Sequence, residues 1–242
     1  MATVVPDKAS KEKKKQQVEQ MFDNISPYYD FLNHLLSFGI DIIWRNKAIA
    51  HLKQDQPQIL LDVATGTADF AIQAMKLKPR KIIGVDISAG MLEKGIIKIR
   101  KKGLQDRINL QQADSEDLPF ADGHFDAAMV AFGVRNFENL DKGLSEIHRV
   151  LKPGGKLAVL EFSQPPKFPV RQLYKLYFMH VLPAVGRLVS KNSRAYDYLP
   201  ESVYAFPSGK DFENRLELAG FVSPRTQRLT FGIASVYTGI KK

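Results

Sequence analysis

A glycine turn and a carboxylate about twenty residues apart are the residues of this chain best suited to bind a nucleoside. The strand-like run Leu60–Val63 leads into Gly66 and Thr67, and a second run from Lys81 ends at Asp86. Gly66 lets the backbone turn sharply and approach a ligand closely. Asp86 is placed to accept hydrogen bonds from ribose hydroxyls. The spacing predicts an α/β nucleotide site.

The turn departs from the dinucleotide-binding fingerprint G-x-G-x-x-G. Only Gly66 is a glycine; Ala64 and Ala68 occupy neighbouring small positions, and Asp69 is expected to open the next helix. A carboxylate there would repel a pyrophosphate at the helix N-terminus. It would tolerate a ligand with a cationic amino-acid end, such as S-adenosylmethionine. The motif therefore favours a methyltransferase over an NAD enzyme, with an ordinary strand–helix turn as the alternative.

Three more strand patterns follow along the chain: 107–112, 125–130 and 156–161. A helix is expected over Leu140–Leu151, ended by Lys152–Gly155, a basic last turn followed by proline and glycine. Ligands of open parallel sheets bind at the carboxyl ends of the strands. Asp114 and Ser115, after the third strand pattern, are then placed to bind the edge of an adenine. A solvated loop is the alternative for them.

The order of these blocks resembles class I S-adenosylmethionine-dependent methyltransferases. The blocks are LLDVATGTADF, GVDIS, QADSEDLPF, FGVRN and RVLKPGG. Two stretches resemble the C-methyltransferases of menaquinone and ubiquinone biosynthesis more specifically. One is Tyr29–Asn33 with Ser37, Gly39 and Trp44–Arg45; the other is Phe132–Asn136 with Leu160–Pro165. The match runs from about Phe22 to the last strand, although Ala68 stands where many relatives carry glycine, and Ala131 where some carry serine.

We therefore expect an α/β fold with a seven-strand, mostly parallel, doubly wound sheet and helical caps. The late helix around Phe212–Ala219 is followed by two strand patterns, 221–227 and 232–240, expected to close the sheet as an antiparallel pair. The whole chain, 1–242, is expected to be one domain. Its expected parts are an N-terminal cap (1–53), a cofactor-binding core (54–163), a helical lid (164–208) and the closing elements (209–242).

The resemblance implies methyl transfer from S-adenosylmethionine to a ring carbon of a prenylated quinol, first of all demethylmenaquinol. Gly66, Thr67, Asp86, Asp114 and Ser115 would hold the methyl donor. Arg135 would stabilise the phenolate form of the acceptor and Asn136 would hydrogen-bond the quinol oxygens, unless Arg135 instead pairs with a core carboxylate. Candidates for proton removal are Tyr28, His180, Tyr196 and Asp197. The five scattered histidines and the absence of cysteine indicate no metal site.

The net charge of +9 is unevenly distributed. Residues 54–163 hold fifteen basic and fifteen acidic side chains, whereas residues 164–242 hold twelve and five, an excess of seven. An anionic membrane surface fits that excess, at about 1 kcal/mol per nearby basic side chain. Nucleic acid also fits this excess of positive charge. However, the sequence has no aromatic single-strand-binding motif, so we do not expect nucleic acid as a partner. Solubility charge is the plain alternative.

The flanks carry apolar stripes. Val18, Met21, Phe22 and Ile25 recur with helical spacing, after Lys11–Lys15, which we interpret as a solvated lead-in. The stretch 168–188 is expected to be helical and is rich in large residues, so we expect it either to pack in the core or to form a lid over an apolar substrate. As a lid it would dock on the membrane through Arg171, Lys175 and Arg187, with Tyr174, Tyr177 and Phe178 near the headgroups.

No signal-peptide segment or run of about 20 apolar residues occurs. We therefore expect a cytoplasmic protein, at most peripheral at the inner face of the membrane. Three alternatives remain open: methylation of the ubiquinone-pathway benzoquinol, methylation of RNA or another small molecule, and a cofactor-binding subunit without catalysis. Tail length and oligomeric state are not predicted.

Overall fold

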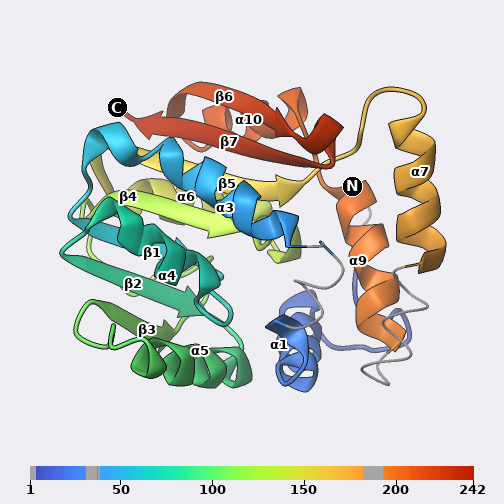
Figure 1. The fold of residues 1–242 in the computed structure, drawn as a ribbon, viewed down its shortest axis with the longest axis horizontal. Helices are drawn as coiled ribbons and strands as arrows, with labels where there is room; N and C mark the ends of the chain where they lie inside the picture. The colour runs from blue at the N-terminus through green and yellow to red at the C-terminus, as the bar shows by residue number, and fades with distance from the viewer. Residues whose placement is uncertain (1–3, 31–36, 38, 182–192) are drawn as a thin grey trace.

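The computed structural model describes residues 4–30, 37, 39–181 and 193–242. Seven strands form one sheet in the order β3-β2-β1-β4-β5-β7-β6 (Figure 1). Their bounds are Ile59–Val63 (β1), Lys81–Asp86 (β2), Ile108–Gln112 (β3), Phe125–Ala131 (β4), Leu151–Phe162 (β5), Phe221–Leu229 (β6) and Ala234–Lys241 (β7). The first five strands are parallel, and β7 runs antiparallel to both β5 and β6. The seven-strand, mostly parallel sheet with an antiparallel closing pair is confirmed.

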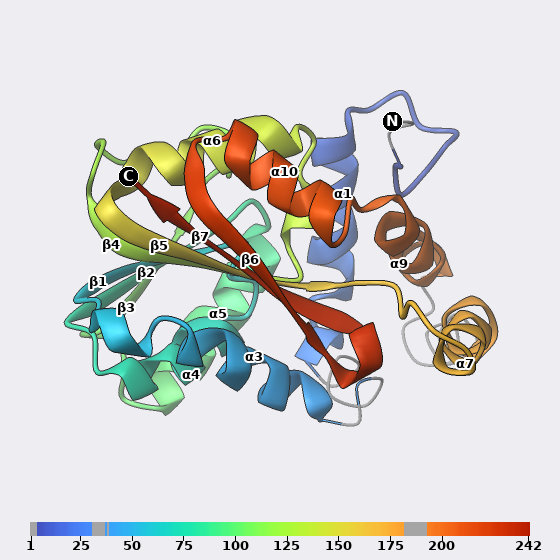
Figure 2. The ribbon, with the colours of Figure 1, turned by 90° about the horizontal axis from the view of Figure 1, so that it is seen from above.

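Helices cover both faces of the sheet (Figure 2). One face carries α3 (Ile40–Ala50), α4 (Asp69–Ala74) and α5 (Ala89–Lys101); the other carries α6 (Leu140–Val150) and α10 (Lys210–Leu218). Two of these helices begin at side-chain caps, because Ser88 accepts from the Met91 amide and Asn139 from the Lys142 amide. The central strands are consequently buried on both sides, which explains their continuous apolar runs.

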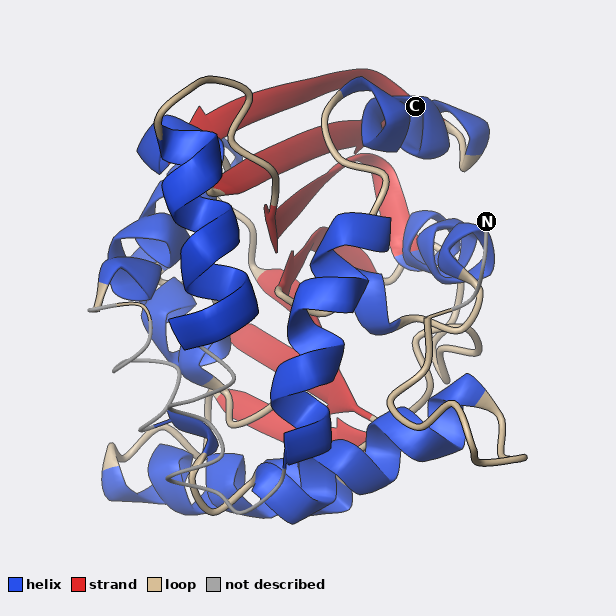
Figure 3. Ribbon diagram, turned by 90° about the vertical axis from the view of Figure 1, so that its right-hand side faces the viewer, coloured by secondary structure: helices blue, strands red, loops and turns tan. Residues whose placement is uncertain are grey.

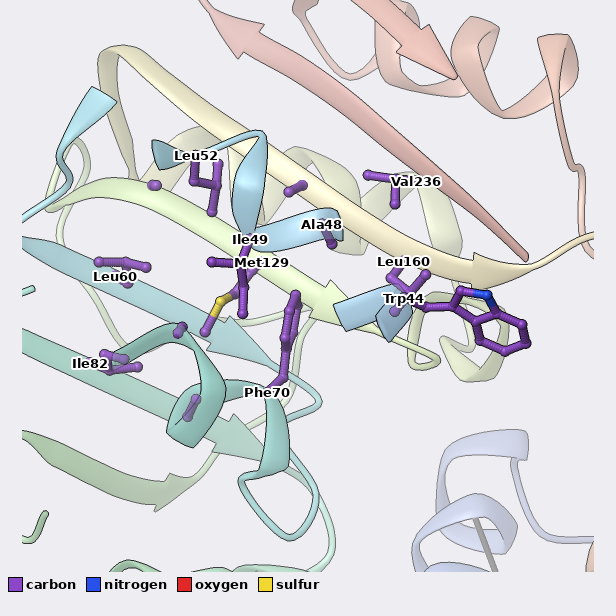
Figure 4. Packing of buried hydrophobic residues seen from close by; sticks show 14 of the residues in the cluster. Trp44, Ala48, Ile49, Leu52, Leu60, Phe70, Ile82, Met129, Leu160 and Val236 are labelled. Atoms are coloured by element: carbon purple, nitrogen blue, oxygen red, sulfur yellow. The ribbon is translucent and has the colours of Figure 1, made fainter. Parts of the chain in front are cut away.

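One of the two large core clusters lies between the sheet and the helices α3, α4 and α5 (Figure 4). Leu60, Met129 and Leu160 project from the strands toward Ala48 and Leu52 of α3, and all five are fully buried. Trp44, one turn earlier on α3, lies toward the carboxyl ends of the strands, where its indole Nε1 donates to Thr230 Oγ1 at 2.8 Å. The core therefore anchors α3 rigidly beside the edge of the sheet where ligands bind.

Three helices stand at the carboxyl ends of β1, β4 and β5 (Figure 3). They are α1 (Lys14–Ile25), α7 (Val170–Leu176), which continues as one π-helical turn over Tyr177–Val181 (η4), and α9 (Ser193–Ala205). Short 3₁₀ turns complete the described elements: Lys53–Asp55 (η1), Met75–Leu77 (η2), Val134–Asn136 (η3) and Thr230–Gly232 (η5). In the described part of the chain, every helix is too short or too polar to cross a bilayer.

Three local expectations are wrong. Lys152–Gly155 does not separate a helix from a strand, because β5 already begins at Leu151 and its pairing with β4 is irregular between Leu151 and Lys156. Lys14 and Lys15 are half-buried rather than solvated. Tyr174 and Phe178 are buried, 5% and 3% exposed, because they pack inward with Val203 of α9 instead of facing outward.

Candidate functional site

A cavity opens between α1 and the carboxyl ends of the first four strands, and its empty space, counted with the open mouth, is about 670 Å³. Every one of the first four strands contributes its terminal residues or the loop that follows. The lining residues are Lys15, Val18, Phe22, Tyr29, Val63, Ala64, Gly66, Val85, Asp86, Ile87, Met91, 113–116, 131–133 and 136–138. Gly66, Asp86, Asp114, Ser115 and Asn136, which the sequence singled out, are all among them.

Asp86 is held in a fixed orientation at the end of β2. Its Oδ2 accepts from the Gly66 amide at 2.8 Å and its Oδ1 from the Ser88 amide at 2.9 Å. The Ile87 amide also bonds this carboxylate, which has about four acceptor positions in all, so Asp86 can still accept from a ribose hydroxyl. Desolvation raises the pKa of Asp86 to about 6, although the Ser88 and Gly66 amides oppose the shift. Gly66 itself has φ +55°, a conformation that favours glycine.

Asp114 is already engaged by a side chain of α1. Its Oδ2 accepts from Lys15 Nζ, and its Oδ1 accepts from the Glu116 amide at 3.0 Å. The hydrogen bond with Asp114 raises the pKa of Lys15. An adenine amine bound at Asp114 would therefore share this carboxylate with Lys15.

Thr67 and Asp69 are placed differently from the expectation. Thr67 does not line the cavity formed by the described residues; its hydroxyl donates to Asp30 Oδ1 and accepts from Lys98 Nζ. Asp69 pairs with the same Lys98 ammonium. The charge of Asp69 is thus offset by Lys98, so Asp69 does not by itself disfavour a pyrophosphate at this turn.

The η3 turn brings Asn136 to the cavity and places Arg135 behind it. Arg135 Nη1 lies 2.7 Å from Glu161 Oε1, and their side chains are only 8% and 0% exposed. Burial raises the pKa of Glu161, while Arg135 opposes that shift. Pairing with a core carboxylate, the alternative considered for Arg135, is what the structure shows. Within the described part of the chain, Arg135 Nε remains buried without a hydrogen-bond partner.

An aromatic wall supports the η3 turn. The Arg135 guanidinium lies 5.6 Å from the centroid of the Phe162 ring, and Phe162 packs on Phe132 at 4.6 Å. Trp44 packs on both rings, with its ring centroid 6.2 Å from that of Phe132 and 6.1 Å from that of Phe162. The resemblance blocks around Trp44 and Phe132 thus meet in space.

Asn136 is oriented by a tyrosine of α9. Tyr198 Oη donates to Asn136 Oδ1 at 3.2 Å, and burial raises the pKa of Tyr198, which keeps this phenol a donor. The Asn136 Nδ2 also donates to the Phe132 carbonyl oxygen at 3.4 Å, so one of its two hydrogens remains for an oxygen of a ligand.

The four candidates for proton removal do not converge. Tyr28 is 47% exposed, His180 and Asp197 are exposed, and none of these three is among the described residues that line the cavity. The side chain of Tyr196 lies outside the described residues, as do Phe31–Asn33 of the resemblance block and Arg187 of the expected docking surface.

Sequence reasoning missed Glu161, Tyr198, Lys14 and Lys15. A signal existed for Glu161, because it is the one charged residue in the apolar run from Leu157 to Phe162. A charge in a buried strand demands a partner. No comparable signal existed for the two lysines, which belong to a run of like charges.

The fold and this cavity define a methyltransferase of the S-adenosylmethionine-dependent class. A solved SAM-dependent methyltransferase from Thermotoga maritima superimposes with a TM-score of 0.60, covering 92% of this chain and all of that one, at 21% identity. The chain belongs to the ubiE/COQ5 methyltransferase family, which it matches over residues 9–241.

Two relatives match nearly the whole chain. The demethylmenaquinone methyltransferase of Bacteroides fragilis is 53% identical over 230 residues, covering 95% of this chain and 94% of its own. The ubiquinone/menaquinone biosynthesis C-methyltransferase UbiE of Geotalea daltonii is 46% identical, with 94% and 97% covered.

Proposed function

We propose that this chain transfers a methyl group from S-adenosylmethionine to a ring carbon of a prenylated quinol, demethylmenaquinol. A bond forms between the ring carbon and the methyl carbon, the sulfur–methyl bond breaks, and the ring then loses a proton to regain aromaticity. The observation that carries the proposal is the meeting of two motifs in one cavity: Asp86 and Gly66 of the donor side and Asn136 of the family block FGVRN. The names of the relatives supply the acceptor class.

On the donor side, Asp86 would bind the ribose, and Asp114 and Ser115 the adenine. Gly66 would let the backbone approach the donor. Thr67 would contribute indirectly, since its hydroxyl ties the turn to Asp30 and Lys98. These residues hold the methyl group close to the acceptor, and such positioning lowers the barrier by up to about 7–11 kcal/mol.

On the acceptor side, Asn136 Nδ2 would donate to a quinol oxygen. A free phenol titrates near 10, as tyrosine does, so the enzyme gains by stabilising the phenolate. Arg135 does not line the cavity, so it would contribute through its positive charge, partly offset by Glu161.

The test is a labelled-donor assay with purified protein and three acceptors: demethylmenaquinol, the benzoquinol of the ubiquinone pathway, and RNA. We expect label in the menaquinol alone or in both quinols. The second quinol is included because the Geotalea daltonii relative is named for both pathways. Label in RNA but in neither quinol would refute the proposal, and donor binding without any turnover would assign the chain to a non-catalytic subunit.

We further propose that α7 meets the membrane in which a prenylated quinol resides. α7 carries the exposed apolar residues Leu173 and Leu176, and the η4 turn that continues it carries Met179; they are 63%, 57% and 51% exposed. Arg171 and Lys175 are exposed on the same helix and suit anionic headgroups. This surface replaces the one expected from Tyr174 and Phe178. The association would be peripheral, at the cytoplasmic side.

A further inference from the structure

The first turn of α1 is hydrogen-bonded directly to the turn that carries Asn136. Lys14 Nζ donates to the carbonyl oxygen of Arg135 at 3.1 Å and to that of Phe137 at 2.7 Å. These two carbonyls flank Asn136 in the chain. A charged donor makes such hydrogen bonds about twice as strong as neutral ones. The ammonium group therefore holds both ends of the segment whose middle residue faces the cavity.

The rest of α1 is seated independently of Lys14. Val18, Met21 and Ile25 are buried in one cluster with Tyr198, the tyrosine that orients the Asn136 amide. Lys15 pairs with Asp114 on the donor side. Loss of the Lys14 ammonium should thus leave α1 in place and release only the η3 turn.

The surroundings of Lys14 make its charge sensitive to pH in an accessible range. Burial, helped by the nearby Arg135, lowers the pKa of Lys14 to about 8, while Glu116 and Glu138 oppose the shift. Lys14 also lines a second, open cavity together with Glu138 and with Arg215 of α10. Arg215 is paired with Asp141.

We propose that Lys14 is a positioning residue, whose ammonium group holds the Arg135–Phe137 segment so that the Asn136 amide meets the acceptor. The role in turnover rests on the proposed function; the link between Lys14 and Asn136 does not. Misplacement of a group by about 1 Å costs up to roughly 100-fold in rate, so removal of the ammonium should impair chemistry more than donor binding.

The kinetic test compares Lys14→Met, Lys14→Arg and the control Lys11→Met, which removes an exposed charge from the same segment. We expect Lys14→Met to lower kcat about 10- to 100-fold, with the donor Kd, from calorimetry, changed less than about threefold. Lys14→Arg should restore most of kcat. The ratio of wild-type kcat to that of Lys14→Arg should fall above about pH 8, because the lysine loses its charge there and the arginine keeps it. The inference would be overturned if Lys14→Met lost donor affinity as much as kcat, or if Lys14→Arg had the same pH profile of kcat as the wild type.

A second measurement needs no acceptor. The side-chain amide resonance of Asn136 is followed as a function of pH in nitrogen-15-labelled protein, and Asn136→Asp serves to assign it. In the wild type and in Lys11→Met, this resonance should shift with an apparent pKa near 8. The shift should be absent in Lys14→Met. Its persistence there would break the link between the two residues. If the wild type methylates no quinol, the proposed function fails. The resonance experiment still decides whether Lys14 fixes the position of the Asn136 amide.

Discussion

Asp86 is the residue whose removal should separate donor binding from the rest of the molecule. Asp86→Ala removes the carboxylate that would accept the ribose hydroxyls, and each hydrogen bond to a charged group contributes about 1.5–3 kcal/mol. We expect the donor Kd, measured by calorimetry, to rise at least about tenfold. Asp106→Ala, a change at an exposed carboxylate, serves as the control. An unchanged Kd in Asp86→Ala would remove Asp86 from the donor site.

The raised pKa of Asp86 gives donor binding a pH dependence. Its value of about 6 in the folded protein means that the carboxyl group gains a proton as the pH falls through 6. A protonated carboxyl is a poorer acceptor for a ribose hydroxyl, so donor affinity should weaken by up to about tenfold per pH unit below 6. Calorimetric titrations between about pH 5 and 8 measure it. The same slope in Asp86→Ala would assign the effect to another group.

The buried pair of Arg135 and Glu161 allows stability to be separated from chemistry. Arg135→Met leaves the Glu161 carboxylate buried without its partner, which costs about 3–5 kcal/mol of unfolding free energy. Adding Glu161→Gln should recover most of that loss, because no buried charge remains. Turnover should stay about 10²–10³ lower in both variants, with donor affinity nearly unchanged. Denaturant unfolding and the labelled-donor assay measure the two quantities; full turnover in the double variant would show that Arg135 is purely structural.

At the scale of elements, α7 carries the prediction for the membrane. Leu173→Ser with Leu176→Ser and Met179→Ser removes the exposed apolar side chains, and each large apolar side chain contributes up to about 1.5–3 kcal/mol when fully buried. We expect at least about tenfold weaker sedimentation with anionic vesicles. Leu218→Ser, on α10 and 79% exposed, is the matched control. Equal sedimentation of the triple variant and the control would exclude α7 as the contact surface. Vesicle binding that does not depend on lipid charge would exclude contact of Arg171 and Lys175 with anionic headgroups.

Most elements could be predicted because the central strands of a doubly wound sheet are buried on both faces and therefore read as apolar runs. The same rule placed Gly66, Asp86, Asp114 and Asn136 at one cavity, since parallel strands end at one edge of the sheet. The start of β5 was not predictable, because Pro153 and Gly154 end helices far more often than they form an irregular stretch inside a strand.

Side-chain directions were the part that the pattern of residues could not supply. Thr67 follows Gly66 directly, yet its hydroxyl bonds Asp30 and Lys98, which lie far away in the sequence. Lys14 and Lys15 look like Lys11 and Lys13 in sequence, and only the loops opposite α1 distinguish them. Tyr174 and Phe178 turned inward because Phe162 and Val203 offer them a buried surface.

For the whole molecule, the donor should be coupled to the seating of α1, which contributes Lys15, Val18 and Phe22 to the cavity. An opening that releases the donor becomes less favourable by about 2.7 kcal/mol at 100 times the Kd. Amide hydrogen exchange in α1 should therefore slow by up to about 100-fold on donor binding. The amides of α10 exchange through fraying that leaves the cavity intact, so they should exchange at the same rate with and without donor. Equal α1 exchange in both states would show that α1 does not enclose the donor.

The position of α1 also affects how quickly the enzyme can work. The spent donor would leave from the cavity to which α1 contributes Lys15, Val18 and Phe22, so we expect each catalytic cycle to include a movement of this helix. Helix and lid movements of that kind take microseconds to milliseconds, and release of product limits the turnover of many enzymes. Substitutions that improve the packing of Val18, Met21 or Ile25 would make the protein more resistant to heat and at the same time prolong the stay of the product. Adaptation of this protein to higher temperature is thus expected to proceed through parts of the molecule other than α1.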